Sequence, residues 1–422
     1  MNIQELYALF KSSAGVNTDT RTIRENQLFF ALKGENFDGN AFALNALEAG
    51  ACRAVVSDTI EADDPRLIKV PDTLKTLQEL AAYHRKQLDI PVIGLTGTNG
   101  KTTTKELIRA VLSAKYSVKA TTGNLNNDIG VPLTVLGIGE DAQIAIVEMG
   151  ASHPEDLRPL LAVSQPTHGL ITNVGKAHLL GFGSYEGVKH AKGLLYDYLK
   201  EHDGVVFANA DDEVLQEMLW EREMTRIPYG LEGVTLLRAT PQEPFLTMVF
   251  GGKTTLRTQL VGAYNAANIM AALKIGWFFE VPEADALAAI AAYMPSNNRS
   301  QLVKTQKNTL IVDAYNANPS SMAVALDNLS LGEGRKVALI GEMRELGAEA
   351  AVEHRKIVER LQGMEAYLVG EEFAKAAEGT GIPVFESSDA LAAYLQEHPL
   401  EGCTILIKGS RGTRMEKVIA SL

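Results

Sequence analysis

The segment VIGLTGTNGKTTT, from Val92 to Thr104, decides the fold of this chain. An apolar run ends in glycines, then come a lysine, three threonines and KELIRAVL, whose apolar residues have helical spacing. A strand, a glycine loop and a helix in this order form a cradle for a nucleotide polyphosphate, because backbone N–H groups and the helix dipole face the phosphate oxygens. The segment therefore predicts a phosphate-binding loop made of Gly97, Thr98, Asn99, Gly100, Lys101, Thr102 and Thr103.

Lys101 and Thr102 are the residues of this loop that carry chemistry. In a P-loop the lysine reaches the β- and γ-phosphates, and the hydroxyl binds Mg²⁺. The strict P-loop pattern has a glycine five residues before Gly100, where this chain has Leu95. An ordinary glycine-asparagine turn before a helix is the alternative, but the strand, loop and helix signals agree on a phosphate site.

Composition excludes several classes of protein. A net charge of −12 argues against a nucleic-acid partner, because phosphate backbones select basic surfaces. Cys52 and Cys403 lie far apart in sequence and fit neither a disulfide framework nor a metal knuckle. The N-terminus lacks the pattern of a signal peptide, and no apolar stretch approaches the ~18–20 residues that span a bilayer. We therefore expect a cytoplasmic protein without membrane insertion.

The length of 422 residues suggests roughly two to four domains, and the sequence separates into three regions. In the middle region, AQIAIVEMG, THGLITNVG and GVVFANAD are typical of buried parallel strands with chemistry at their carboxyl ends. We predict an α/β protein with a central P-loop-type, mostly parallel sheet covered by helices on both faces. A small N-terminal α/β module and a C-terminal Rossmann-like α/β domain flank it. The predicted ranges are 1–88, 89–294 and 295–422.

Three positions in the central region are candidates for metal chemistry. Glu148 ends the strand AQIAIVEMG opposite the phosphate loop, where a carboxylate can hold Mg²⁺; an ordinary polar strand end is the alternative. His178 follows the next strand, in NVGKAHL, and is either a metal ligand or a structural histidine. Lys192 lies in the helical segment GVKHAKGLLYDYL, and its position alone predicts a solvated lysine.

Two stretches of the C-terminal region are candidates for ligand binding. DAYNANPSS follows the strand NTLIV, and Asp313 within it can accept hydrogen bonds from ribose hydroxyls. A helix cap around Asn318 and Ser320 is the alternative. KGSRGTR, from Lys408 to Arg414, is a basic strand end that suits a carboxylate or a phosphate, or else a solvated loop.

Taken together, these stretches resemble the Mur ligases over essentially the whole chain. GTNGKTTT resembles the phosphate loop of the family, NLNNDIGVPLT its substrate-side loop, and NVGKAHL with the downstream alanine-lysine pair its metal-histidine and modified-lysine motifs. DAYNANPSSM and GEMRELG are typical of the MurF branch, which joins D-alanyl-D-alanine to UDP-N-acetylmuramoyl-tripeptide. The N-terminal DTR and LFFALKGENFDG resemble the uridine-nucleotide module of that branch.

The resemblance implies a catalytic centre and its cofactors. ATP and two Mg²⁺ ions would be bound, with Lys101 and Thr102 serving the phosphates and one metal. Glu148 and His178 resemble metal ligands. Lys192 resembles the carbamoylated lysine of the family, whose added carboxylate would join the second Mg²⁺.

The resemblance also implies contacts with nucleotide and substrates. Asn268 and Arg299 would contact the adenine side and the phosphate side of ATP, and Asp313 the ribose. UDP-N-acetylmuramoyl-tripeptide and D-alanyl-D-alanine would be the partners of a protein expected to be a monomer. The implied substrate-binding residues are Thr20, Arg21, Lys33, Asp38, Asn124, Asn126, Asn127, Asn316, Lys408 and Arg411.

Three positions depart from the pattern of the family. Asn40 stands where a histidine is expected, and Tyr264 replaces a histidine in GAYNAAN. Leu194 stands where an acidic residue commonly follows the modified lysine, which removes a charge near the implied metal site.

The implied reaction transfers the γ-phosphate of ATP to the tripeptide carboxylate, and the amine of the dipeptide then attacks the acyl phosphate. The C-terminal domain is expected to close over ATP, with all three domains moving as rigid bodies. The alternatives are another ligase of the superfamily, similar to MurE or folylpolyglutamate synthase, a P-loop GTPase or kinase, or a catalytically silent nucleotide-binding regulator. The arginine-containing DNPR motif of MurE is absent, and without any Asn-Lys pair an NKxD guanine motif cannot exist.

Overall fold

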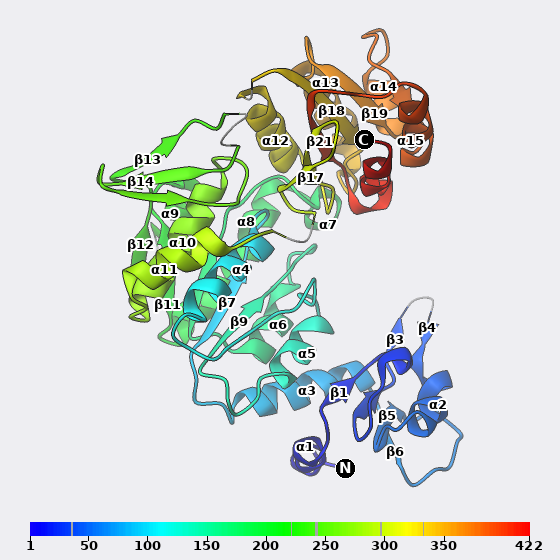
Figure 1. Cartoon of the computed structure of the whole chain (residues 1–422). Coiled ribbons are helices and arrows are strands. Elements are labelled where there is room, and N and C mark those ends of the chain that lie inside the picture. The colour runs from blue at the N-terminus through cyan, green and yellow to red at the C-terminus, as the bar shows by residue number, and fades with distance from the viewer. Residues whose placement is uncertain (35–36, 221, 241–243, 296–297, 332) are drawn as a thin grey trace.

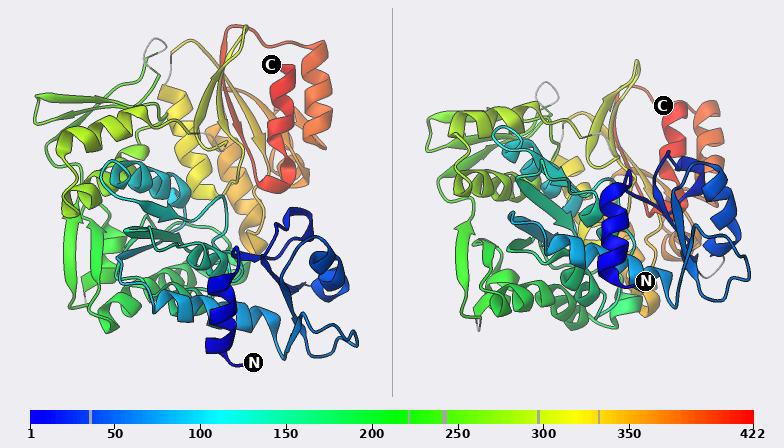
Figure 2. Two further views of the ribbon diagram at one scale, coloured as in Figure 1. Left: turned by 60° about the horizontal axis from the view of Figure 1, so that its bottom comes forward. Right: turned by 90° about the horizontal axis from the view of Figure 1, so that it is seen from below.

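Three α/β units follow one another along the chain (Figure 1). The computed structural model describes residues 1–34, 37–220, 222–240, 244–295, 298–331 and 333–422. Residues 35–36 of the LFFALKGENFDG stretch and residues 296–297 beside the predicted boundary at 294/295 lie outside this description. The two outer units adjoin different parts of the central one (Figure 2).

The N-terminal unit contains a parallel sheet and a short hairpin. The predicted strands LFFAL and RAVVSD are confirmed as β2 and β5, and the sheet order is β1-β2-β5-β6. The hairpin pairs β3 with β4 in antiparallel register. The elements are α1 (Ile3–Ser12), β1 (Val16–Asn17), β2 (Leu28–Phe30), β3 (Lys33–Gly34), β4 (Phe37–Asp38), α2 (Ala43–Glu48), β5 (Arg53–Ser57), β6 (Leu67–Val70) and α3 (Thr73–Arg85).

The central unit is built on a parallel sheet in the order β12-β11-β10-β7-β9-β8. Every residue of β7 and β9 is buried, as expected for interior strands with helices on both faces. The P-loop thus leaves the middle of the sheet at its carboxyl edge. The strands are β7 (Val92–Thr96), β8 (Val118–Ala120), β9 (Ile144–Glu148), β10 (His168–Ile171), β11 (Val205–Asn209) and β12 (Thr225–Tyr229).

Alternate residues of these strands feed two apolar clusters, one on each face. Ile93 and Leu95 pack with α4 (Lys101–Leu112), α10 (Asn265–Phe278) and α11 (Glu283–Ala292). Val92 belongs to the other cluster, formed with α5 (Gly130–Leu136), α6 (Leu157–Ser164) and α8 (Tyr185–Glu201). The predicted doubly covered sheet is confirmed. The remaining helices of the unit are α7 (Leu179–Phe182) and α9 (Glu213–Trp220).

A small antiparallel sheet in the order β13-β14-β15 was not predicted from the sequence. Its strands are β13 (Val234–Leu237), β14 (Thr247–Phe250) and β15 (Thr254–Arg257). Leu246, Met248 and Leu256 lie in the same apolar cluster as α10, so the sheet extends the core of the central unit.

The C-terminal unit has a mixed sheet in the order β16-β17-β21-β18-β19-β20. The edge strand β16 runs antiparallel to β17, and the other strand pairs described for this sheet are parallel. The apolar runs in NTLIVDAY, RKVALIGEM, AYLVG and CTILIKGS each predict a strand, and these strands are confirmed as β17, β18, β19 and β21. The elements are β16 (Gln301–Lys304), β17 (Thr309–Asp313), α12 (Pro319–Leu331), β18 (Arg335–Gly341), α13 (Ala350–Arg360), β19 (Glu365–Val369), α14 (Glu371–Ala376), β20 (Val384–Phe385), α15 (Ser388–Glu397) and β21 (Cys403–Lys408).

Helix α3 joins the N-terminal unit to the central one. Leu77 and Leu80 are fully buried and belong to the same apolar cluster as Val131 of α5 and Leu157 of α6. The buried Arg85 guanidinium donates to the carbonyl oxygens of Ser164, Leu88 and Gln165. An apolar core therefore continues across the domain boundary placed at residue 88, and that boundary stays a prediction.

Among the described residues, no helix combines the length and the apolar composition that crossing a membrane requires.

Candidate active site

A cavity of about 1020 Å³ opens at the carboxyl edge of the central sheet and is closed on its other side by the C-terminal unit. Residues far apart in the sequence therefore face one space. The predicted site residues that line it are Thr98, Asn99, Gly100, Lys101, Thr102, Thr103, Asn126, Asn127, Glu148, His178, Asn268, Arg299, Asp313, Asn316 and Lys408.

The P-loop has the backbone shape that its glycines predict. Gly97 and Gly100 have φ of 143° and 79°, values that L-residues rarely adopt. A Cβ at Gly97 would lie 2.0 Å from the Thr172 hydroxyl oxygen. Asn268, assigned to the adenine side, accepts from the Thr104 hydroxyl at 3.0 Å and lies where it would contact a Cβ at Gly100. This asparagine therefore supports the loop from behind.

Lys101 folds back on the loop. Its Nζ donates to the carbonyl oxygens of Gly97 at 2.7 Å and Thr98 at 3.0 Å. Burial lowers the pKa of Lys101 to about 8; the Glu148 carboxylate opposes this shift, and the Arg299 guanidinium adds to it. A triphosphate bound in the loop would place negative charge beside this ammonium group and would stabilise its protonated form.

Glu148 has the features of a cation-binding carboxylate. Its Oε1 accepts from the Thr102 hydroxyl at 3.2 Å and from Asn126 Nδ2 at 2.8 Å. Its Oε2 is buried and has no hydrogen-bond partner. Buried carboxylate oxygens are normally satisfied, and Mg²⁺ binds through one or two carboxylates together with substrate phosphates. Thr102 and Glu148 therefore fit a magnesium ion between the P-loop and β9.

The rest of the metal shell must come largely from other groups. Over the described ranges, no cluster of three or more histidine, cysteine, aspartate or glutamate side chains could hold a metal ion. His178, phosphate oxygens, water and a modified lysine are the ligands that remain for Mg²⁺.

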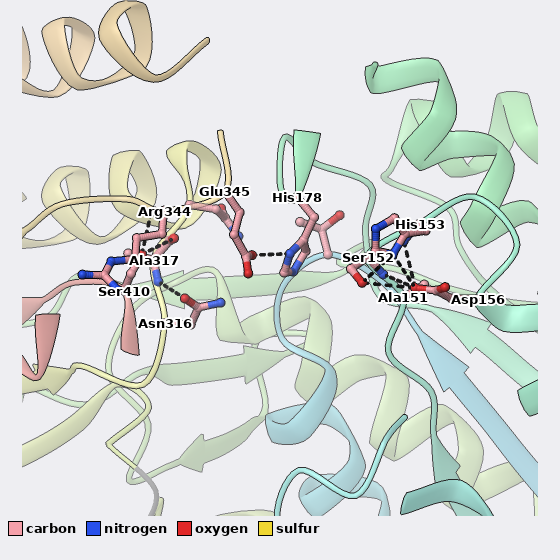
Figure 3. Close-up of polar contacts among 12 residues, drawn as sticks. Ala151, Ser152, His153, Asp156, His178, Asn316, Ala317, Arg344, Glu345 and Ser410 are labelled. Atoms are coloured by element: carbon pink, nitrogen blue, oxygen red, sulfur yellow. Dashed lines mark hydrogen bonds and ion pairs between the residues drawn. The ribbon is translucent and has the colours of Figure 1, made fainter. Parts of the chain in front are cut away.

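His178 meets a carboxylate from the other side of the cavity (Figure 3). Its Nδ1 lies 2.5 Å from Oε2 of Glu345 in the C-terminal unit. Burial lowers the pKa of His178, the Glu345 carboxylate opposes this, and the Lys101 and Lys192 ammonium groups add to the lowering. A neutral imidazole is the form that binds metals. GEMRELG was predicted to be a motif of the MurF branch, but the sequence alone indicated no role for Glu345 within it.

Lys192 is buried, so the expectation of a solvated lysine drawn from its position alone was wrong. Its side chain on α8 is 2% exposed, and Nζ lies 3.4 Å from the Ala151 carbonyl oxygen and 5.4 Å from the Phe182 ring centroid. Burial lowers its pKa well below the usual value, Lys101 adds to this, and Asp156 opposes it. Ala151 and Asp156 line the cavity, whereas Lys192 lies just behind that wall.

The three asparagines of the substrate-side loop, Asn124, Asn126 and Asn127, lie in different surroundings. Asn126 donates to Glu148, and Asn127 Oδ1 accepts from the Gly130 amide at 2.8 Å at the start of α5. Asn124 is exposed and lies outside the cavity lining. These bonds hold the loop in place beside the Glu148 carboxylate.

A polar cluster after Glu148 was not singled out from the sequence (Figure 3). Asp156 Oδ2 accepts from the amides of Ser152 and His153, each at 2.8 Å, and from the Ser152 hydroxyl at 3.1 Å. All three residues line the cavity. The signal that could have found them is their place directly after the strand that ends in Glu148.

The C-terminal wall combines a stacked arginine with a buried ion pair. The Arg299 guanidinium lies 3.7 Å from the Tyr315 ring centroid, and its buried Nε has no partner. Asp313 Oδ2 lies 2.5 Å from Lys408 Nζ, and Oδ1 accepts from the Ser300 amide at 3.1 Å. Both oxygens of Asp313, the predicted ribose acceptor, are thus already bonded within the C-terminal unit.

Other predicted substrate residues have mixed placements. Asn316 accepts from Lys408 through its carbonyl oxygen at 3.1 Å, and Lys408 is 2% exposed. Arg411 lies 5.6 Å from the Tyr315 ring and outside the cavity lining. Thr20, Arg21, Lys33 and Asp38 lie on the N-terminal unit, and none of them lines the cavity.

The three departures from the family pattern each have a local partner. Asn40 Oδ1 accepts from the Ser57 amide at 2.9 Å. The Tyr264 hydroxyl lies 2.5 Å from the Ser300 hydroxyl, and burial raises the pKa of the phenol. Leu194 is 4% exposed and packs in the apolar cluster beneath α8.

Polar contacts link the central and C-terminal units around the cavity. Asn318 Nδ2 donates to Asn99 Oδ1 at 2.7 Å, and Lys176 Nζ donates to Glu353 Oε1 at 3.1 Å. Asn318 also accepts from the Ser321 amide at 2.9 Å, so the predicted helix cap is present beside the cavity contact. These bonds hold the two units together with the P-loop enclosed.

Comparison with known proteins agrees with this site. The family model for the Mur ligase middle domain matches residues 95–276, the one for the Mur ligase, glutamate ligase domain matches 298–411, and the one for the Mur ligase family, catalytic domain matches 13–85. The chain belongs to the Mur ligase family.

Two relatives within that family carry the same name. A protein of Bacillus subtilis is 35% identical over 97% of this chain and 93% of its own length, and one of Escherichia coli is 34% identical over 96% and 93%. Both are named UDP-N-acetylmuramoyl-tripeptide–D-alanyl-D-alanine ligase.

Solved structures of MurF have the same fold. MurF from Acinetobacter baumannii superposes with a TM-score of 0.87 at 29% identity, covering 100% of this chain and 98% of that one. MurF ligase from Thermotoga maritima in complex with ADP gives 0.85 at 26% identity, with 97% of each chain covered.

Proposed function

We propose that this protein joins D-alanyl-D-alanine to UDP-N-acetylmuramoyl-tripeptide with ATP, through an acyl phosphate, in cytoplasmic synthesis of peptidoglycan precursors. One observation carries the proposal. A P-loop lysine and a buried carboxylate with a free oxygen share a cavity with the C-terminal unit, in a chain whose relatives bear the name of this activity. The site offers charge and enclosure, which are what this reaction needs from a protein.

The reaction brings two anions together. The tripeptide carboxylate attacks the γ-phosphorus and releases ADP; the dipeptide amine then attacks the acyl carbon, loses a proton and expels inorganic phosphate. Lys101 would hold the phosphate oxygens during both steps, and the P-loop amides would orient them; its position in the loop supports this role. Mg²⁺, held by Thr102 and Glu148, would supply further positive charge at the transferred phosphoryl group.

Exclusion of water protects the acyl phosphate from hydrolysis. Arg299 and Tyr315 of the C-terminal unit line the same cavity as the P-loop, and Asn99 is bonded directly to Asn318 across it. Residues of both units therefore surround the place where the acyl phosphate forms.

Lys192 is proposed to carry a carbamate in the active enzyme, because carbon dioxide reacts only with a neutral amine. Burial and the neighbouring Lys101 charge both lower the pKa of Lys192, which favours that neutral form. The carbamate would return a negative charge to the site and provide oxygen ligands for a second Mg²⁺. Lys192→Ala is expected to be nearly inactive and to regain part of its activity when acetate or formate is added.

The two substrates are proposed to enter from different units. Thr20, Arg21, Lys33 and Asp38 on the N-terminal unit would bind the UDP-sugar end of the first substrate. Asn316, Lys408 and Arg411 of the C-terminal unit would face the dipeptide. A monomer suffices for this arrangement, since one chain carries all three units.

The decisive experiment measures ATP-dependent phosphate release from UDP-N-acetylmuramoyl-tripeptide with D-alanyl-D-alanine, and identifies the pentapeptide product by mass spectrometry. Single amino acids and folate-type acceptors are run in parallel. Fastest release with the dipeptide supports the proposal. Faster release with a single amino acid or with glutamate would assign the chain to a MurE-like or a folylpolyglutamate synthase-like activity instead. Absence of turnover with every acceptor would favour a silent nucleotide-binding regulator.

A further inference from the structure

The contact between His178 and Glu345 joins two residues in an unusual backbone conformation. His178 has φ of 50° and Glu345 has φ of 64°, in the left-handed region that non-glycine residues seldom occupy. Their side chains meet at 2.5 Å, and the Leu180 amide donates to the Glu345 carbonyl oxygen at 3.3 Å. Backbone strain is often found at functional sites, and these two residues meet across a domain boundary beside the cavity. The contact between them is therefore a candidate for a function.

The loop that carries Glu345 is fixed by hydrogen bonds on the C-terminal unit. The Met343 amide donates to His354 Nε2 at 3.0 Å. The Arg344 amide donates to the Ser410 hydroxyl at 2.9 Å, as Figure 3 shows. These two bonds hold the residues immediately before Glu345. The position of the carboxylate therefore depends on where the C-terminal unit sits.

The geometry sets the tautomer of His178. A carboxylate can only accept, so the tautomer of the neutral ring that makes this contact favourable carries its hydrogen on Nδ1 and its lone pair on Nε2. His178 lines the cavity, and over the part of the chain that the structure describes Nε2 has no hydrogen-bond partner. The ring is thus left with one free nitrogen of the kind that binds a metal.

We propose that Glu345 is a positioning residue that orients His178 as a ligand of Mg²⁺, so that docking of the C-terminal unit completes the metal site. The inference rests on the proposed binding of ATP and Mg²⁺ in this cavity. Metal-binding histidines commonly donate their other N–H to a carboxylate, which fixes the ring and raises its basicity. Here that carboxylate comes from a different domain. Metal binding and domain docking must then favour each other equally, because such coupling is reciprocal.

The test replaces Mg²⁺ with Mn²⁺ and needs no turnover. Mn²⁺ binding is measured by electron paramagnetic resonance in the presence of a non-hydrolysable ATP analogue, and pulsed spectra report coupling of Mn²⁺ to a histidine nitrogen. Glu345→Ala is expected to weaken Mn²⁺ binding about 10–100-fold and to reduce the nitrogen coupling, the range found when such outer partners are removed. Glu345→Gln, which still presents an acceptor oxygen, should recover part of both signals.

Asp327→Ala is the matched control. Asp327 pairs with Arg360 at 2.6 Å within the C-terminal unit, with a side chain 63% exposed against 61% for Glu345. It should leave Mn²⁺ affinity and nitrogen coupling unchanged.

Unchanged affinity and coupling in Glu345→Ala would overturn the proposal. So would a variant whose domains dock less tightly in solution scattering while the nitrogen coupling stays as in the wild type, because Glu345 would then act only as a clasp. Failure of the ligase assay with D-alanyl-D-alanine would refute the proposed substrate but leave these spectra readable. Wild-type spectra without nitrogen coupling would refute the role of His178 even in an active ligase.

Discussion

The central unit meets its two neighbours in different ways. Towards the N-terminal unit, α3 places Leu77 and Leu80 in a shared apolar core. Around the cavity, the boundary with the C-terminal unit consists of polar pairs such as Asn99 with Asn318, Lys176 with Glu353 and His178 with Glu345. An apolar contact with the C-terminal unit lies near the segment of chain that leads from the central unit into it. There Val261 packs in the apolar cluster of the C-terminal helices.

This difference predicts which of the two boundaries opens and closes. Buried apolar side chains stabilise by roughly 1.5–3 kcal/mol each, whereas exposed ion pairs contribute about 0–1 kcal/mol. The N-terminal boundary is therefore a permanent one. The polar contacts around the cavity can be replaced by contacts with water when the two units separate, and the Lys176 and Glu345 side chains are 42% and 61% exposed even in the docked state. Val261 and the bonded pair Tyr264 and Ser300 mark the hinge side. The expected rigid-body motion of three domains stays a prediction. The difference between the two boundaries favours motion of the C-terminal unit against the other two.

The largest effect should come from breaking the apolar boundary. Leu80→Ala is expected to lower the free energy of unfolding by about 2–5 kcal/mol, because it removes a fully buried side chain from the shared core. Lys176→Ala, at the polar boundary, should cost less than about 1 kcal/mol. Urea denaturation followed by circular dichroism measures both. Equal losses would mean that the two boundaries do not differ as described.

Lys101→Ala should act on turnover and spare the fold. A drop of about 10²–10³ in kcat is expected, as for removal of one preorganised donor to a transition state. The urea midpoint should not fall, because the variant removes a buried ammonium whose pKa is already lowered. Lys75→Ala, on the exposed face of α3, is the control. Turnover close to wild type would exclude Lys101 from the mechanism.

Lys176→Met should loosen the polar boundary without unfolding either unit. Lys176 binds Glu353 with a side chain 42% exposed, so loss of the pair should shift the balance between open and docked states by up to about fivefold. Small-angle scattering with an ATP analogue and UDP-tripeptide should show a smaller radius of gyration than the free protein, and a smaller decrease in the variant. A radius that ligands leave unchanged would indicate a site formed before they bind.

The smallest effect is a proton taken up on binding of ATP. The folded pKa of Lys101, about 8, lies below its usual value of 10.5, so the unfolded chain binds more protons between these pH values and stability rises with pH there. Phosphate oxygens should raise the pKa again. Calorimetry at pH 8 in buffers of different ionisation enthalpy should report uptake of about half a proton, less at pH 7, and none in Lys101→Met. Equal uptake in the variant would point to another group.

Much of the fold followed from local patterns. The P-loop and the strands ending at Glu148 and Asp313 were predictable, because runs of buried apolar residues and glycine-rich turns encode them directly. The antiparallel β13–β15 sheet was missed: its short strands are partly exposed and gain their stability from packing on α10. Strand β16 was missed because antiparallel pairing at a sheet edge leaves no distinct pattern in four residues.

The site was predictable in its parts but not in its pairings. Glu148 and Lys101 could be named because each closes a recognisable motif. The contact between His178 and Glu345 joins residues distant in sequence, and it depends on how two units dock. The burial of Lys192 could not be predicted either. A lysine in a helix is expected to be exposed unless the packing of that helix on the sheet is known.

Helix α3 has a consequence for exchanging parts between related ligases. The family match to the N-terminal region ends at residue 85, and a chimera cut after it would bring a foreign α3 into the native core of α5 and α6. The residues that replace Leu77, Leu80 and Arg85 would then pack against helices and carbonyl groups of a different protein. A cut between Pro71 and Asp72 keeps the native helix together with its N-cap, since the Asp72 carboxylate accepts from the Lys75 amide at 2.9 Å. The N-terminal segment that can be exchanged between ligases therefore ends before α3, whereas the family match extends to residue 85.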